Sequence, residues 1–307
     1  MLLFGLTAVS EDAKSIMKKV AANTAASVDS RRQYVYRQRV RSSLLQSNGK
    51  ILCKESREYT VTPQAATTER KVVSFSGECL EGNQMIPYSQ PAVVQPGMSQ
   101  SGMKEKGAKD DVDRESIAAV MNDLATDPNS RDGIPPVLFP LRNEDLESYR
   151  FSLKGETTVK GRRAYDITFE PAERKGVCID IGDDKSKAGV HVHLGADDPE
   201  PERTACRPWK GEVWVNAEDF QPVRIVTELA KGVPWGVRVF LGTDVRQVGF
   251  SLTYQRVAEG VWFPATYGTE FRVVALWAWK RTITMSMENT DFRKTDAQST
   301  VRFEDPR

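Results

Sequence analysis

The chain has 307 residues, a formal net charge of +1 and 28% charged residues. This length can bury a large core, and the composition is that of an ordinary globular protein. Because the basic residues are scattered, the charge pattern argues against a nucleic-acid partner. No apolar run reaches the roughly 18 residues that a membrane helix needs, so no transmembrane segment is expected.

The first ten residues hold a short apolar run that no basic residue precedes and no cysteine follows. We interpret residues 1–10 as a signal-peptide remnant or a disordered N-terminus, and residues 11–307 as one domain. A helix is predicted next, over residues 10–28, with Ser10 as its N-cap. Its apolar stripe consists of Ala13, Ile16, Met17, Val20, Ala21 and Val28.

Strict alternation of apolar and polar residues then predicts antiparallel strands with one buried face. The predicted strands are 33–45, 50–62, 69–80, 149–156, 162–170, 209–216, 222–229, 246–257, 262–274, 277–291 and 298–303. A mobile loop at 89–111, a second helix at 114–126 and a polar insertion at 172–208 interrupt them. The fold class is therefore mainly β (α+β): a single highly curved antiparallel sheet of about ten or eleven strands, with two helices against its concave side.

The four cysteines favour two local disulfides. Cys53 and Cys79 would lie opposite each other in a hairpin, where the strand spacing suits a disulfide. Cys178 and Cys206 bracket the polar insertion. Four unrelated thiols are the alternative. Disulfides would indicate an oxidising compartment, so we expect an exported, periplasmic protein.

No catalytic motif marks an active site, and no cofactor is expected. The chain has no G-x-S-x-G elbow, P-loop or dinucleotide fingerprint. His191 and His193 are the only histidines, and on a strand they would share a face. They are weak candidates for a metal site, because no third ligand lies at a recognised spacing.

The segment at 232–242 is apolar and bounded by glycine. One interpretation is a short helix or turn that plugs the end of the sheet. The other is a mobile lid over an apolar cavity, with Trp235 and Phe240 on the lid, or a contact surface for a membrane or partner.

Four motifs resemble the outer-membrane lipoprotein-sorting-like proteins, the LolA/LolB-like superfamily. They read YRF from Tyr149, GRRAYDI from Gly161, WKGEVWVNAEDFQPVR from Trp209 and GVWFP from Gly260. The resemblance covers residues 149–304 well and the N-terminal part in outline. It implies an unclosed β-barrel wrapped around helices, and the carriers of that superfamily hold acyl chains in the concave cavity.

The leading hypothesis is a non-enzymatic periplasmic carrier or binding protein for a lipid, an acyl chain or a lipidated protein. An envelope sensor or scaffold domain that binds another protein is the alternative, and a metal-dependent enzyme using the two histidines is the third. The expected cavity residues are Val223, Ile225, Phe250, Leu252, Phe263, Phe271, Ile283, Met285 and Met287. Methionine suits such a surface because its side chain is flexible and polarisable.

Overall fold

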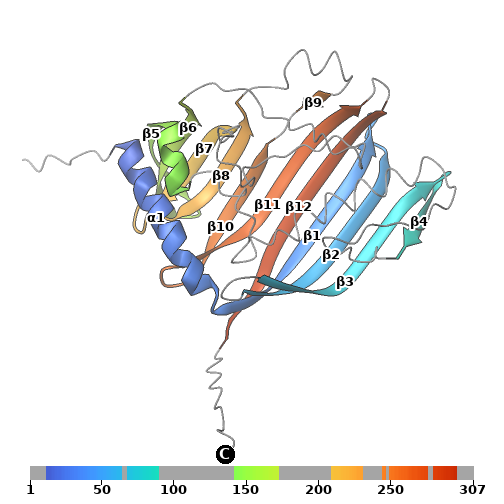
Figure 1. Ribbon diagram of the computed structural model, residues 1–307, viewed down its shortest axis with the longest axis horizontal. Coiled ribbons are helices and arrows are strands. Elements are labelled where there is room, and N and C mark those ends of the chain that lie inside the picture. Colours follow the sequence, from blue (N-terminus) through green and yellow to red (C-terminus); the bar gives the residue numbers. More distant parts are fainter. Residues whose placement is uncertain are drawn as a thin grey trace, which may run out of the picture.

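A computed structural model describes residues 12–63, 68–89, 142–172, 209–230, 244–246, 249–275 and 279–295. They form one twelve-stranded sheet in the order β4-β3-β2-β1-β12-β11-β10-β8-β7-β6-β5, and β9 pairs separately with β11 (Figure 1). The first strands are β1 (Tyr34–Gln46), β2 (Ile51–Pro63), β3 (Thr68–Glu81), β4 (Gln84–Tyr88), β5 (Tyr149–Val159) and β6 (Arg162–Pro171). The remainder are β7 (Trp209–Asn216), β8 (Pro222–Leu229), β9 (Asp244–Arg246), β10 (Phe250–Ala258), β11 (Val261–Ala275) and β12 (Trp279–Lys294).

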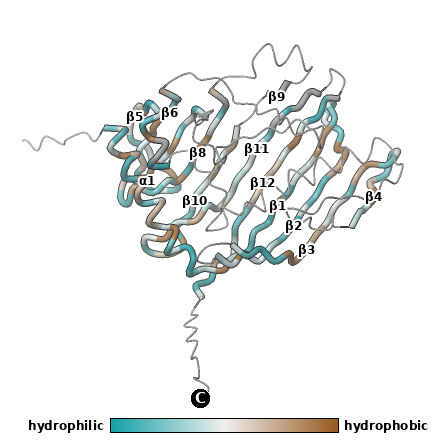
Figure 2. The backbone as a smooth tube through the Cα atoms, viewed as in Figure 1, coloured by the Kyte–Doolittle hydropathy of each residue, from teal (hydrophilic) through white to brown (hydrophobic). Residues whose placement is uncertain are grey.

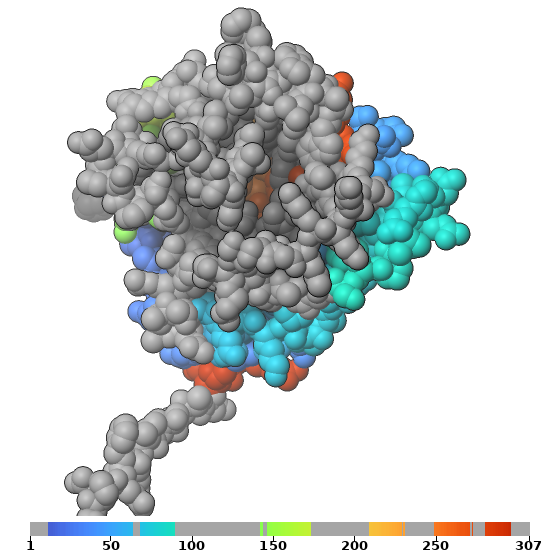
Figure 3. All heavy atoms as spheres, turned by 45° about the vertical axis from the view of Figure 1, so that its right-hand side comes forward, coloured from blue at the N-terminus to red at the C-terminus, as the bar shows by residue number. Residues whose placement is uncertain are grey.

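The sheet is antiparallel throughout its described ladders, curved and not closed, as predicted. Its edge strands, β4 and β5, do not pair with each other within the described part of the chain. The first and last of the described strands, β1 and β12, meet in the middle of the sheet instead. Figure 3 shows the described atoms of β3 and β4, in cyan and teal, on one flank of the molecule.

Hydrophilic and hydrophobic positions follow each other along the strands (Figure 2). Because successive side chains of a strand point to opposite faces, each strand has a more apolar face and a more polar one. On β1, Tyr36, Val40 and Leu44 are buried, whereas Arg39 and Arg41 on the other face are exposed. The arginines of β1 thus lie on the solvated face of the strand. The β1–β2 hairpin turns at Asn48 and at Gly49, whose φ of +83° favours glycine.

Helix α1 (Ala13–Arg31) lies on the inner face. The expected cap at Ser10 is wrong: Asp12 is the N-cap, and its Oδ1 accepts a 2.7 Å hydrogen bond from the backbone N–H of Ser15. The predicted stripe is buried from Ala13 to Ala21, and Val28 is half-buried. The helix packs mainly on β5, β11 and the short 3₁₀ helix η2 (Asn143–Ser148).

Two strands differ from the sequence prediction. The edge strand β4 was not predicted, because it is short and contains Pro87. The predicted strand 246–257 is divided between β9 and β10. The second predicted helix, 114–126, and the last predicted strand, 298–303, lie outside the described residues.

Candidate ligand-binding face

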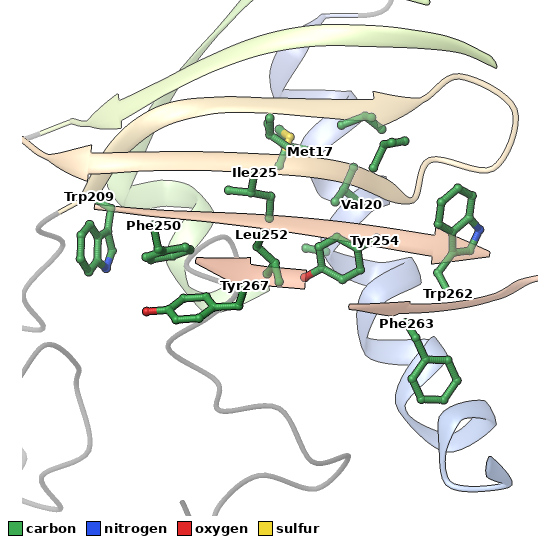
Figure 4. Close-up of a cluster of buried hydrophobic side chains, with 14 of the residues drawn as sticks. Met17, Val20, Trp209, Ile225, Phe250, Leu252, Tyr254, Trp262, Phe263 and Tyr267 are labelled. Carbon is green, nitrogen blue, oxygen red and sulfur yellow. The ribbon is translucent and has the colours of Figure 1, made fainter. Parts of the chain in front are cut away.

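The first five expected cavity residues lie on the inner face of β8, β10 and β11. Val223, Ile225, Phe250, Leu252 and Phe263 are all buried. They join one hydrophobic cluster with the apolar stripe of α1 (Figure 4). On this flank the sheet and the helix therefore form a packed core.

The expected residues of β12 continue the same face away from the main contacts of α1. Met285 and Met287 are register partners of Thr269 and Tyr267 on β11, and both are buried. Ile283 belongs to a second cluster. Phe271 pairs with Ile283 through the backbone, and its side chain lies outside the description. The apolar inner face thus extends from β7 across β12 to β1.

The predicted disulfide between Cys53 and Cys79 is confirmed. The two residues are register partners on β2 and β3, with Cα atoms 4.0 Å apart. They pack with Leu44 and Ile283 in the second cluster. The bond therefore fastens β3 to the apolar face near its β4 edge.

A buried ion pair on β2 was not predicted from the sequence. Arg57 Nε donates to Glu55 Oε1, and the two side chains are 5% and 0% exposed. Tyr88 donates a 2.8 Å hydrogen bond to the other carboxylate oxygen of Glu55. Burial alone would lower the pKa of Arg57, but Glu55 and Tyr59 outweigh it and raise that pKa. Each of the two side chains therefore holds the other in place.

Two neutral polar residues are also buried on the inner face. Gln38 and Asn289 are register partners on β1 and β12, 1% and 2% exposed. The side-chain amide of Asn289 donates a 3.0 Å hydrogen bond to the carbonyl of Pro264. The Oδ1 of Asn289 accepts no hydrogen bond from the described residues. The inner face is thus apolar on its α1 flank and mixed over β1, β2 and β12.

The turn between β7 and β8 ties the sheet to α1. Trp262 Nε1 of β11 donates a 2.8 Å hydrogen bond to Asp219 Oδ2. Asp219 Oδ1 accepts a 2.8 Å bond from Asn216, and the Asp219 carbonyl accepts another of 2.8 Å from Asn23 of α1. Phe220, which has a φ of +51°, lies under Lys19 of α1. The motif from Trp209 to Arg224 thus includes this turn, and we call its hydrogen-bonded contact with Trp262 and α1 the joint.

The last turns of α1 complete this joint. Gln221 Nε2 donates 3.0 Å to Ser27 Oγ, which in turn donates 2.7 Å to the carbonyl of Asn23. Arg31 donates 3.3 Å to the carbonyl of Trp262, and both residues are buried. Helix α1 is therefore fixed at the rim of the sheet rather than merely lying on it.

Ion pairs on the outer face link β5 to β6, β7 to β8 and, across β6, β5 to β7. Lys154 bonds Glu212 at 2.7 Å, Lys210 bonds Glu228 at 3.0 Å and Arg150 bonds Glu170 at 3.0 Å. Within the described ranges, the exposed large hydrophobic residues are Ile51 and Val73. The described outer face therefore presents no broad apolar patch for docking.

The remaining expected residues fall outside the described residues: His191, His193, Cys178, Cys206, Trp235 and Phe240. Among the residues described, no three acidic, histidine or cysteine side chains gather as a metal site would require. No helix in that part of the chain is long and apolar enough to span a membrane.

No family model and no curated protein matches the chain. Among solved structures, a LolA superfamily protein from Nitrosomonas europaea is 11% identical, with a TM-score of 0.30 over 94% of this chain and 96% of that one. A DUF1329 family protein from Desulfovibrio piger is 12% identical, with a TM-score of 0.34 over 94% and 96%. The Pseudomonas aeruginosa MucA/MucB complex matches at 9% identity, with a TM-score of 0.24 over 93% and 99%.

Solved structures similar to this chain thus include a LolA superfamily protein and a putative outer membrane lipoprotein-sorting protein domain. Because these identities and TM-scores are low, the fold rests on the sheet itself, and the site rests on the residues of this chain.

Proposed function

We propose that the protein binds a lipid, an acyl chain or a lipidated partner on the inner face of its curved sheet, without catalysing a reaction on it. The observation that carries the proposal is the width of the buried apolar face. It runs from Val213 on β7 to Val40 on β1, whereas α1 packs mainly on β5 and β11. A hydrocarbon chain is the ligand that such a face suits best.

The methionines support the same ligand class. Met285 and Met287 occupy successive inner positions on β12, in the part of the face farther from α1. Thioether side chains adapt to flexible hydrocarbon of differing length, which rigid aliphatic residues do less well. The cross-strand disulfide supports export to an oxidising compartment such as the periplasm.

Uptake of a long-chain fluorescent fatty acid tests the proposal. The wild-type chain should bind the probe, and Met285→Asp should weaken binding at least tenfold, because a carboxylate on the inner face repels hydrocarbon. Ser286→Asp is the matched control, since Ser286 is the next residue of β12 and is exposed on the other face. Circular dichroism checks that both variants keep the sheet.

Failure of the wild-type chain to take up any hydrophobic probe would reject the lipid-binding proposal. Binding of an envelope protein would then become the leading function. The ion-paired outer face weighs against that alternative, because it presents no broad apolar patch among the residues described.

A further inference from the structure

One ladder in the middle of the sheet is much shorter than its neighbours. Strands β8 and β10 are register partners at only three described positions, Arg224↔Thr253, Ile225↔Leu252 and Val226↔Ser251. The ladder from β7 to β8 has seven such positions, and the ladder from β10 to β11 has eight. The centre of the short ladder, Ile225 with Leu252, is fully buried in the core.

Regular pairing between β8 and β10 stops at each end of this short ladder for a different reason. At one end, Pro222 would face Gln255, but proline has no amide hydrogen to donate. At the other end, the Thr227 hydroxyl takes the place of a backbone ladder partner. It accepts a 3.1 Å hydrogen bond from the backbone N–H of Phe250 and donates a 3.3 Å hydrogen bond to the carbonyl of Phe250. A Cβ added to Gly249 would lie 2.2 Å from the carbonyl oxygen of Thr227. The two strands therefore touch here without regular pairing.

An open notch lies at the Thr227 end of the ladder. It has a volume of about 600 Å³ and lies between β8, β10 and β11. Its lining consists of Val226, Thr227, Glu228, Gly249, Phe250, Ser251, Gly268, Thr269 and Glu270. Phe250 also belongs to the core, so the notch and the apolar inner face share a wall.

Aromatic rings continue inward from this shared wall. The ring of Phe250 lies 5.1 Å from that of Trp209 and 5.7 Å from that of Tyr267, between centroids (Figure 4). These edge and tilted contacts keep three large flat side chains next to each other without hydrogen bonds between them. Such rings can separate and close again around a hydrocarbon more readily than a hydrogen-bonded ladder can.

The opposite end of the ladder is fastened. Asp219 in the β7–β8 turn and Trp262 at the start of β11 are joined by a 2.8 Å hydrogen bond across it. Helix α1 holds both partners, through Asn23 to the Asp219 carbonyl and through Arg31 to the Trp262 carbonyl. If β8 and β10 separate, they therefore hinge at the Asp219–Trp262 end and part at the notch.

We propose that the short ladder between β8 and β10 is the entrance for the hydrocarbon ligand, with the notch as its mouth and the Asp219–Trp262 bond as its hinge. This inference rests on the proposed function. The end of a single acyl chain enters beside Phe250, and the Thr227–Phe250 bonds and the three-position ladder break transiently to admit it. Cooperative opening begins where the fewest ladder bonds hold two strands together.

A disulfide that locks the ladder tests the entrance. Val226→Cys with Ser251→Cys joins two register partners, as Cys53 and Cys79 are already joined elsewhere in the sheet. The matched control is Thr253→Cys with Thr266→Cys, a register pair on β10 and β11 whose hydroxyls are 2.7 Å apart. The readouts are the initial rate and the final amount of fluorescent fatty acid taken up, before and after oxidation.

Closing the Val226–Ser251 lock should slow uptake at least tenfold, and closing the control lock should change it less than twofold. Amide hydrogen exchange supplies a second measurement that needs no ligand. Amides that bond across β8–β10 should exchange at least tenfold faster than those that bond across β10–β11 or β7–β8.

Normal uptake through a closed lock, or equal exchange in the three ladders, would overturn the entrance and leave the binding function standing. A wild-type chain that takes up no probe would instead overturn the binding function itself, and the entrance with it.

Discussion

The indole nitrogen of Trp262 donates a 2.8 Å hydrogen bond to Asp219, and this single bond joins parts of the chain 43 residues apart. The same carboxylate also accepts from the Asn216 side chain, and the same turn is bonded to α1. Asp219 is therefore the point at which the β7–β8 turn, the β10–β11 hairpin and the helix meet.

Asp219→Ala should lower the free energy of unfolding by about 2–3 kcal/mol, because it leaves the Trp262 indole and the Asn216 amide without their acceptor. Urea unfolding followed by circular dichroism measures the change. Glu218→Ala is the control: Glu218 is exposed in the same turn, and its loss should cost less than about 0.5 kcal/mol. Equal stability of the two variants would show that the joint is not held by this carboxylate.

Gly211→Ala should destabilise the sheet strongly, by at least about 2 kcal/mol, or prevent folding. A Cβ at this position would lie 1.9 Å from the backbone oxygen of Val226, so β7 and β8 would have to move apart. The control is Gly268→Ala on β11, where a Cβ meets no atom within 4 Å. Thermal unfolding compares the two, and a Gly211→Ala protein as stable as the control would contradict the close approach.

Tyr267 gives the protein a pH dependence at high pH. Burial raises the pKa of Tyr267 from its ordinary value of 10 to about 12, although a hydrogen bond to Thr269 lowers it in part. The folded state therefore holds this proton more tightly than the unfolded state does. The resulting stability, about 2–3 kcal/mol, is complete below pH 10 and is lost as the pH rises from 10 to 12.

Tyr267→Phe removes this titration, so stability should fall less steeply between pH 10 and pH 12 than in the wild-type protein. Urea unfolding at intervals across that range gives both slopes. Other groups titrate there too, but they do so in both proteins and cancel in the difference. Equal slopes of unfolding free energy against pH in the two proteins would mean that the Tyr267 hydroxyl is not buried.

The Glu55–Arg57 pair should behave as a coupled unit. Glu55→Gln leaves a buried guanidinium without its counter-ion and should cost about 3–5 kcal/mol, whereas Glu55→Met combined with Arg57→Met should cost much less, because no charge is left buried. Urea unfolding of each single and double variant gives the free energies of unfolding for the double-mutant cycle. Additive effects of Glu55→Met and Arg57→Met would show that the two charges do not interact.

The sheet could be predicted from the sequence because alternation is a local property. On β10, Phe250, Leu252 and Tyr254 alternate with polar residues, and the structure buries all three. Cys53 and Cys79 could be paired for the same reason, since both lie on the buried parity of neighbouring strands.

The polar inner residues could not be predicted, because on β2 both parities are polar. Lys54, Ser56 and Glu58 alternate with Glu55 and Arg57, and nothing in that run says which set is buried. The register with β1 and β3 decides it. Likewise, the sequence marks the turn around Asp219 but contains no local sign that its carboxylate meets Trp262, because that contact depends on how the sheet curves.

The central position of β1 and β12 has a consequence for how the chain is made. Gln38 and Met287 touch in the finished sheet but are 249 residues apart. At a synthesis rate of 5–20 residues per second, β1 waits roughly ten seconds to a minute for the strand that will cover its edge.

During that interval a thirteen-residue strand has one unpaired edge, which could aggregate with other chains. Arg37, Arg39 and Arg41, on the outer parity of that strand, place positive charge along it and oppose such association. The three arginines on the outer parity of β1 would therefore oppose aggregation of the nascent chain until β12 is made.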